Sequence, residues 1–275
     1  MYESASQGDN GSLVDNVVDL LASGRAGLVT DVDGTISPIV AVPEEARLLP
    51  GARQALSELR RVLTLVAVVS GRTAAEAKSM VGIDGLIYVG NHGFEVLSER
   101  GPEIVPAVTP WIPRLATVLE TVRAQIRQPG IVIENKGATA SLHYRLAPDP
   151  ELAQRELLEI LTQSALPSGL RFEEGRMVFN LLPPLGISKG SAVSWLAAEH
   201  RLDRLVYLGD DETDAHAFRA LHVLRQSGEV RTLSIAVVGS ETPFSVRHLA
   251  DATLPSVEAV VNMLCRVAER LKSEC

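Results

Sequence analysis

Aromatic residues are scarce in this chain of 275 residues, where Phe, Trp and Tyr together make up only 4%. So few aromatic side chains disfavour a surface that binds nucleic acid by stacking on bases. The net charge is −8, so no general basic surface attracts a polyanion. We therefore expect no nucleic-acid partner. An anionic substrate would need a local cluster of cations or a metal ion.

Cysteines and long apolar runs are also lacking. The only cysteines, Cys265 and Cys275, form neither a metal-binding spacing nor a disulfide framework, which fits a reducing compartment. The first residues, MYESASQGDNGS, lack the basic and apolar regions of a signal peptide. No uninterrupted apolar run approaches the length of a membrane span. We expect a cytoplasmic protein without membrane association; the oligomeric state stays open, and a monomer is compatible with the sequence.

Apolar residues are abundant, at 46%, and they occur in alternating strand-like and helix-like segments. Strands are predicted at 27–33, 63–70, 85–91, 204–210 and 232–239, and helices at 51–62, 73–81, 188–200, 211–224 and 256–272. Short apolar, β-branched runs that alternate with amphipathic helices are typical of a parallel sheet covered on both faces. The sequence thus predicts an α/β fold with a Rossmann-like parallel sheet.

The middle of the chain has a different pattern: a helix at 111–128, a hairpin at 130–146, a helix at 150–165 and a hairpin at 170–183 with Gly175 at its turn. This order predicts an inserted α+β module whose sheet has one open face. We therefore predict a tail and short helix over 1–22, a core domain over 23–100 and 185–275, and a cap domain over 101–184.

Polar residues follow the predicted core strands. Asp31 and Asp33 end the run GLVTDVDG, Ser70 ends VAVVS, and Asp210 ends RLVYLGD. Ligands of open parallel sheets bind beyond the carboxyl ends of the strands, so these side chains are expected to meet there. Lys189, at the start of a helix, adds a cation. The DxDG stretch alone is equally compatible with a capped turn.

This combination suits phosphoryl transfer through a carboxylate nucleophile. Asp31 would attack the phosphorus, and Asp33 would protonate the leaving oxygen and then deprotonate water. Ser70 and Lys189 would bind the phosphoryl oxygens. Mg²⁺ is the expected cofactor, since it prefers oxygen ligands. Its predicted site consists of Asp31, the backbone carbonyl of Asp33, Asp210 and Asp214. Asp214 is expected to orient the groups that contact the ion.

The stretches DVDGT, VVSGR, Lys189 and GDDETD resemble, in order, the four motifs of phosphatases of the haloacid dehalogenase (HAD) superfamily. The resemblance covers nearly the whole chain beyond residue 25 or so, and the inserted module lies where one class of these proteins has its cap. The stretches TISPIV, GNHGFE, ENKG, HYR and GDDETDAHAF further resemble trehalose-6-phosphate phosphatases. This resemblance implies Mg²⁺-dependent hydrolysis of trehalose 6-phosphate to trehalose and phosphate, a step of trehalose biosynthesis, through an aspartyl-phosphate.

The resemblance also implies a set of residues that contact the sugar phosphate. These are Gly71, Arg72, Asn91, His92, Glu95, Glu134, Lys136, Arg145 and Asn180. Glu134, Lys136 and Arg145 are expected to project from the cap sheet. Each has a structural alternative: His92 could be a turn residue, Lys136 a solvated hairpin-tip lysine, and Arg145 a partner of Glu134 across the hairpin.

Two positions depart from the family pattern. Asn180 stands where a sugar-binding glutamate is expected, and Leu182 where a basic residue is common. Asn has a shorter reach than Glu and no charge. This departure leaves open a phosphatase of another sugar phosphate, such as sucrose 6-phosphate or a glycosyl-glycerate phosphate. A sugar phosphomutase is a further alternative, because it would use the same aspartates. The departure also leaves open a non-catalytic sugar-phosphate-binding regulator, although Asp33 would then have no evident use.

Overall fold

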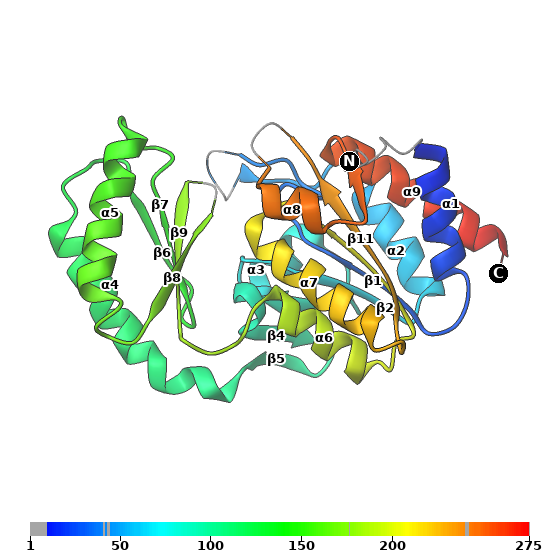
Figure 1. The fold of residues 1–275 in the computed structure, drawn as a ribbon, viewed down its shortest axis with the longest axis horizontal. Coiled ribbons are helices and arrows are strands. Elements are labelled where there is room, and N and C mark those ends of the chain that lie inside the picture. The colour runs from blue at the N-terminus through cyan, green and yellow to red at the C-terminus, as the bar shows by residue number, and fades with distance from the viewer. Residues whose placement is uncertain (1–9, 41, 43–44, 176, 240–241, 275) are drawn as a thin grey trace, which may run out of the picture. The chain divides into compact units, whose positions relative to one another are not determined.

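The computed structural model describes residues 10–274 except 41, 43–44, 176 and 240–241, and the chain divides into two compact units (Figure 1). The first comprises the chain up to Gly93, Leu97–Gly101 and the chain from Ile187 onward. The second comprises Phe94–Val96 and Pro102–Gly186. The predicted fold class, a parallel-sheet α/β core with an inserted α+β module, is confirmed. Independent domains with boundaries at residues 101 and 184 stay a prediction, and residues 1–9 of the expected tail lie outside the described residues.

The large sheet has the strand order β12-β11-β10-β1-β2-β3-β4-β5, and neighbours from β12 to β3 are parallel. The strands are β1 Ala26–Thr30, β2 Leu65–Val69, β3 Ile87–Gly90, β4 Glu95–Ser98, β5 Gly101–Ile104, β10 Arg204–Gly209, β11 Arg231–Val237 and β12 Ala252–Leu254. β1 and β2 are buried along their whole length, which explains why their sequences are almost entirely apolar. β4 and β5 are not predicted, because these short segments contain Gly, Pro and charged residues and no apolar run.

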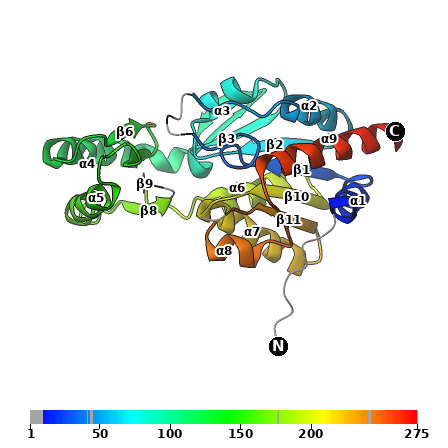
Figure 2. The same ribbon diagram turned by 90° about the horizontal axis from the view of Figure 1, so that it is seen from above.

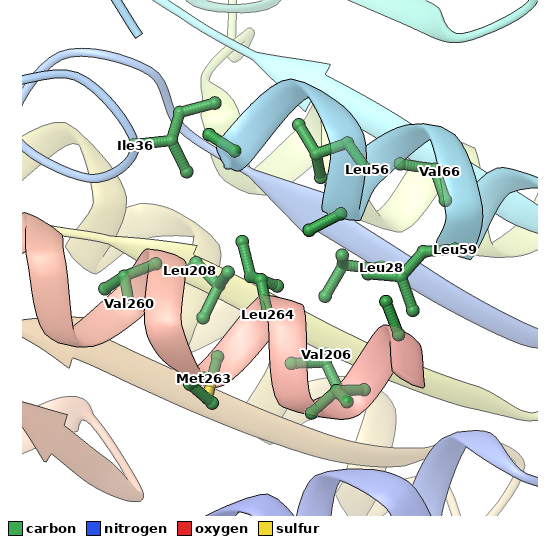
Figure 3. Packing of buried hydrophobic residues seen from close by; sticks show 14 of the residues in the cluster. Leu28, Ile36, Leu56, Leu59, Val66, Val206, Leu208, Val260, Met263 and Leu264 are labelled. Atoms are coloured by element: carbon green, nitrogen blue, oxygen red, sulfur yellow. The ribbon is translucent and has the colours of Figure 1, made fainter. Parts of the chain in front are cut away.

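Helices cover this sheet on both faces. They are α1 Asn10–Leu21, α2 Ala52–Val62, α3 Ala74–Val81, α6 Lys189–Glu199, α7 Glu212–Gln226, α8 Phe244–Leu249 and α9 Val257–Glu274. Figure 2 shows α2 and α9 on one side of the sheet and α6, α7 and α8 on the other. The apolar stripe of α9 packs with that of α2 over Leu28 and Val206 of the sheet (Figure 3). This packing fixes the positions of the strand ends. None of the described helices combines the length and hydropathy that crossing a bilayer requires.

The second unit contains a four-stranded antiparallel sheet in the order β6-β7-β9-β8. Its elements are α4 Ile112–Gln125, β6 Val132–Asn135, β7 Ala140–His143, α5 Pro150–Ser164, β8 Arg171–Gly175 and β9 Val178–Leu182. The predicted succession of helix, hairpin, helix and hairpin is confirmed, although Gly175 is the last residue of β8. Leu142 and Phe179 belong to one apolar core with residues of α4 and α5. Because strand residues alternate between faces, the opposite face carries the polar residues of the strands.

Candidate active site

Four neighbouring parallel strands end in the residues that the sequence singled out. Asp31 follows β1, Ser70 follows β2, Asn91 follows β3 and Asp210 follows β10. The order β10-β1-β2-β3 places these strand ends side by side at one edge of the sheet. The predicted meeting of the motif residues at this edge is therefore what the fold produces.

Lys189 forms the centre of a buried ionic cluster. Ser188 caps α6 by accepting a hydrogen bond from the backbone N–H of Ser191, so that Lys189 is the first residue of the helix. Its Nζ lies 3.0 Å from Oδ1 of Asp31 and 2.7 Å from Oδ1 of Asp214. The lysine side chain is only 3% exposed, so water screens these charges little.

Burial and charge act in opposite directions in this cluster. Burial raises the pKa of the Asp31 carboxyl to about 7, against the attraction of Lys189, and the negative charges of Asp214 and Asp33 add to the rise. Burial alone would lower the pKa of Lys189, but Asp214 and Asp31 outweigh it and raise that pKa above its usual value. Lys189 thus stays a cation. The Asp31 carboxyl holds its proton up to near-neutral pH, and a further cation beside it would favour the ionised form.

Asp214 accepts hydrogen bonds at both carboxylate oxygens. Oδ1 accepts from Lys189 and, at 2.6 Å, from the hydroxyl of Tyr207. Oδ2 accepts from the backbone N–H groups of Asp210 and Asp211, both at 3.0 Å. The sequence reasoning missed Tyr207. The available signal was a tyrosine within the buried strand RLVYLG, because a buried hydroxyl normally has a partner.

Three buried carboxylates lie together where a cation could bind. Oxygens of Asp31, Asp210 and Asp214 lie within 4.8 Å of one another. Those of Asp31 and Asp210 would contact the ion, since each oxygen of Asp214 already accepts two hydrogen bonds. An all-oxygen donor set of this charge fits a hard divalent ion such as Mg²⁺. The turn after β1 also fits the site: Gly34 has a φ of 85°, and a Cβ there would collide with the Asp210 carboxylate. The glycine of DVDGT is therefore required both by the backbone and by the space that Asp210 takes.

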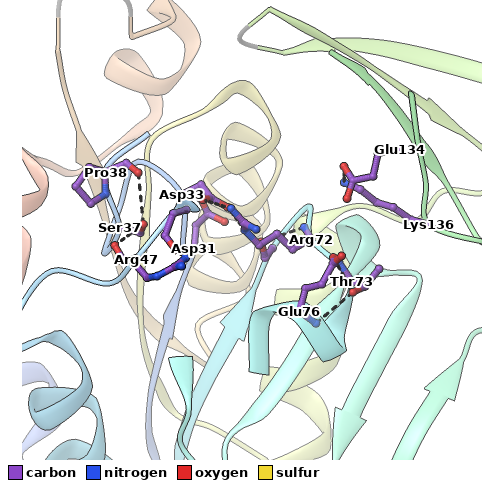
Figure 4. Close-up of polar contacts among 12 residues, drawn as sticks. Asp31, Asp33, Ser37, Pro38, Arg47, Arg72, Thr73, Glu76, Glu134 and Lys136 are labelled. Carbon is purple, nitrogen blue, oxygen red and sulfur yellow. Dashed lines mark hydrogen bonds and ion pairs between the residues drawn. The ribbon is translucent and has the colours of Figure 1, made fainter. Parts of the chain in front are cut away.

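Asp33 is paired with an arginine. Nε and Nη2 of Arg72 donate to the two carboxylate oxygens of Asp33 at 2.7 and 2.8 Å (Figure 4). The backbone N–H of Arg72 also donates to Oγ of Ser70 at 3.1 Å. Such a two-point contact fixes the orientation of a carboxylate. In this structure Arg72, predicted to contact substrate, is thus bonded to the predicted acid/base residue.

The loop after β3 supports the loop after β2. The backbone N–H groups of Asn91 and His92 donate to the carbonyls of Arg72 and Ser70 at 2.7 and 3.1 Å. Both donors have left-handed backbone conformations, with φ of 50° and 59°, which non-glycine residues seldom adopt. The His92 ring occupies the space that a Cβ on Gly71 would need. Glu95 begins β4. Sugar contacts by these residues stay predictions.

The face of the antiparallel sheet opposite its apolar core carries polar groups in one row. Strand register places Glu134 beside Ser141, and Ser141 beside Asn180. The Ser141 hydroxyl donates to Oδ1 of Asn180 at 2.9 Å. Glu173 follows next to Asn180 in the register. Asn180 is therefore held within a row of hydrogen-bonding groups.

Glu134 also contacts two cationic or titratable groups. Nζ of Lys136 lies 3.4 Å from Oε2 of Glu134, and Nε2 of His143 lies 3.2 Å from it. Burial would raise the pKa of Glu134, but the hydrogen bond from His143 and the charge of Lys136 lower it. Lys136 and Arg145, expected to project from the cap sheet, lie beyond the strand ends, because β6 ends at Asn135 and β7 at His143. Both lie in the loops that follow, and roles of Glu134, Lys136, Arg145 and Asn180 in substrate binding stay predictions.

Comparison with known proteins gives a consistent result. The trehalose-phosphatase family model matches residues 29–249. The chain is 34% identical over 218 residues to a trehalose-phosphate phosphatase of Mycobacterium marinum, covering 74% of this chain and 53% of that protein. It is 35% identical over 242 residues to an uncharacterized glycosyl hydrolase of Mycobacterium tuberculosis, covering 82% of this chain but 18% of that protein.

A solved structure has the same fold. The C-terminal domain of Candida albicans trehalose-6-phosphate phosphatase superposes with a TM-score of 0.78 at 22% identity, covering 98% of this chain and 99% of that one. The chain spans less than two thirds of the length of these two curated relatives.

Proposed function

The chain belongs to the trehalose-phosphatase family, and from this premise we propose that it hydrolyses trehalose 6-phosphate to trehalose and phosphate, with Mg²⁺, through an aspartyl-phosphate on Asp31. The observation that carries this proposal is the buried cluster in which Lys189 contacts both Asp31 and Asp214, next to Asp210. A protein that only binds phosphate would not need a buried carboxylate beside the lysine, because the negative charges of the carboxylate and the phosphate would repel each other and oppose binding.

Each catalytic step is assigned to a particular residue. Asp31 attacks the phosphorus, and the bond from phosphorus to the sugar oxygen breaks. Asp33 gives a proton to that oxygen and then takes one from the water that attacks the aspartyl-phosphate, which restores Asp31. Lys189 and Ser70 stabilise the phosphoryl oxygens.

Asp31, the carbonyl of Asp33 and Asp210 would hold Mg²⁺, which when bound supplies positive charge against the phosphate. Asp214 orients Lys189 from behind these ligands. This role agrees with the four hydrogen bonds that its oxygens accept. We place the reaction in the cytoplasm, with a small-molecule sugar phosphate as the partner.

A phosphatase of a different sugar phosphate is the second candidate, and Asn180 favours it. Phosphate release from trehalose 6-phosphate, glucose 6-phosphate and sucrose 6-phosphate tests both candidates with wild type and Asn180→Glu. We expect wild type to prefer trehalose 6-phosphate, and Asn180→Glu to change KM for it by about tenfold or less, the effect of one hydrogen-bonding group. Turnover of sucrose 6-phosphate alone would support the second candidate. Binding without turnover of any of the three would support a regulator.

We expect Arg72→Lys to slow sugar phosphates more than p-nitrophenyl phosphate, because lysine cannot hold both oxygens of Asp33. Loss of a well-placed proton donor costs about 10²-fold or more with a sugar leaving group, whereas p-nitrophenolate leaves without a proton. The ratio kcat/KM on both substrates measures the difference, because it reports the steps up to the aspartyl-phosphate and not the later attack of water, in which Asp33 acts for either substrate. Arg53→Lys is the control, since Arg53 donates to the carbonyls of Val81 and Met80 at the end of α3. An equal loss on both substrates with a raised KM would instead make Arg72 a ligand of the phosphate.

A further inference from the structure

Tyr207 is a buried residue that the mechanism above does not use. It lies in β10, next to Val29 of β1 in the sheet register, and its side chain is completely buried. Its ring packs edge-on against Phe218, with ring centres 5.9 Å apart and planes at 83°. Its hydroxyl donates to Oδ1 of Asp214 at 2.6 Å. The ring is thus a core residue, and the hydroxyl reaches the ionic cluster.

Tyr207 and Lys189 share one acceptor atom. Nζ of Lys189 donates to the same Oδ1 of Asp214 at 2.7 Å and lies 3.0 Å from Oδ1 of Asp31. The other oxygen of Asp214 accepts two backbone N–H groups. An ionised carboxylate offers about four acceptor positions, so the four donors fill Asp214. Its orientation is fixed, and its charge is divided among them.

We propose that the Tyr207 hydroxyl is a positioning group that keeps Lys189 shared between Asp214 and the nucleophile Asp31; this inference rests on the proposed function. Without the hydroxyl, Lys189 would be the one donor to Oδ1 of Asp214 among the described residues. An oxygen that loses one of two donors attracts the remaining cation more strongly in a buried site. Lys189 would then move toward Asp214, and Asp31 and the phosphoryl group would lose part of its charge.

The test compares Tyr207→Phe with Tyr88→Phe. Both changes remove one hydroxyl from a buried ring; that of Tyr88 in β3 donates to the carbonyl of Ile83 at 2.6 Å, outside the cluster. Phe at 207 keeps the contact with Phe218. Rates are measured with p-nitrophenyl phosphate and Mg²⁺, so that the result does not depend on which sugar phosphate is the substrate. They are expressed per folded molecule, counted from the amplitude of thermal unfolding, so that partial unfolding cannot imitate a loss of activity.

We expect kcat of Tyr207→Phe to fall about tenfold, the effect of one hydrogen bond to a charged group, with KM changed less than about twofold. Tyr88→Phe should lower the melting temperature similarly and leave kcat unchanged. If the wild type is active, two results would overturn this inference alone. One is an unchanged kcat in Tyr207→Phe, and the other is a kcat that Tyr88→Phe lowers by the same factor. A wild type that hydrolyses neither p-nitrophenyl phosphate nor any sugar phosphate would overturn the proposed function, and the inference with it.

Discussion

Asp31→Asn abolishes phosphate release while leaving the protein folded: this is the expected result with the largest effect on activity. The amide of Asn lacks the anionic oxygen that attacks phosphorus, and Lys189 and Asp33 cannot replace it. Removal of a nucleophile that forms a covalent intermediate lowers kcat by at least about a thousandfold. Phosphate release from trehalose 6-phosphate, and acid-stable labelling of the protein by substrate phosphate, are both expected to disappear.

The same substitution is expected to change stability in the opposite direction. The pKa of Asp31 is raised to about 7 from 3.8, so between these values the folded protein holds a proton that the unfolded chain has released. The metal-free protein therefore loses stability at this residue as the pH rises from about 4 to about 7. Asn removes this loss. Without Mg²⁺ at pH 8, Asp31→Asn should be at least as stable as wild type in chemical denaturation.

Asp251→Asn provides the contrast. Asp251 binds the side chain of Arg225 and accepts from the backbone N–H of Ser234 at 2.8 Å, away from the cluster. These contacts lower its pKa against the effect of burial, so its ionised form stabilises the fold. Asp251→Asn should lose stability and keep its activity. If Asp31→Asn kept more than a hundredth of the wild-type activity, Asp31 would not be the nucleophile.

The sequence was sufficient to predict the core of the site because the chemistry follows the strand ends. In a parallel sheet, the residues after neighbouring strands share one edge, so the apolar runs that end at Asp31, Ser70 and Asp210 imply their proximity. The position of Lys189 at the start of a helix predicts that its side chain lies near the same strand ends. The prediction of the α/β fold with its inserted module rests only on the change in periodicity along the chain.

Contacts that depend on side-chain direction could not be predicted in this way. The pairing of Arg72 with Asp33 and the bond of Tyr207 to Asp214 depend on rotamers, which spacing along the chain does not specify. The sequence also does not give the ends of β6 and β7, beyond which Lys136 and Arg145 lie, because strand ends are the least certain part of a pattern. β4 and β5 were missed because they hold their place in the sheet by backbone pairing, with little apolar sequence to mark them.

Lys189→Met should cause the largest loss of stability. The lysine is the cation of a cluster whose side chains are 3% exposed for Lys189, 6% for Asp31 and none for Asp214. Met fills a similar volume but leaves two buried carboxylates together without a cation. Removal of one partner of a buried pair costs about 3–5 kcal/mol. Urea denaturation of the metal-free protein at pH 8, above the pKa of about 7 of the Asp31 carboxyl, measures the free energy of unfolding, and activity is expected to be lost as well.

Two further variants separate the loss of the buried positive charge from the effect of replacing any lysine by methionine. Lys78→Met removes a lysine whose partner Asp84 lies 3.1 Å away at the surface, where a pair contributes about 0–1 kcal/mol. Adding Asp31→Asn to Lys189→Met should restore part of the lost stability, because the double variant has one buried charge fewer. If Lys189→Met were as stable as Lys78→Met, the charge of Lys189 would not be what stabilises the cluster. A double variant no more stable than Lys189→Met alone would show that the cost lies in packing and not in the burial of the Asp31 carboxyl.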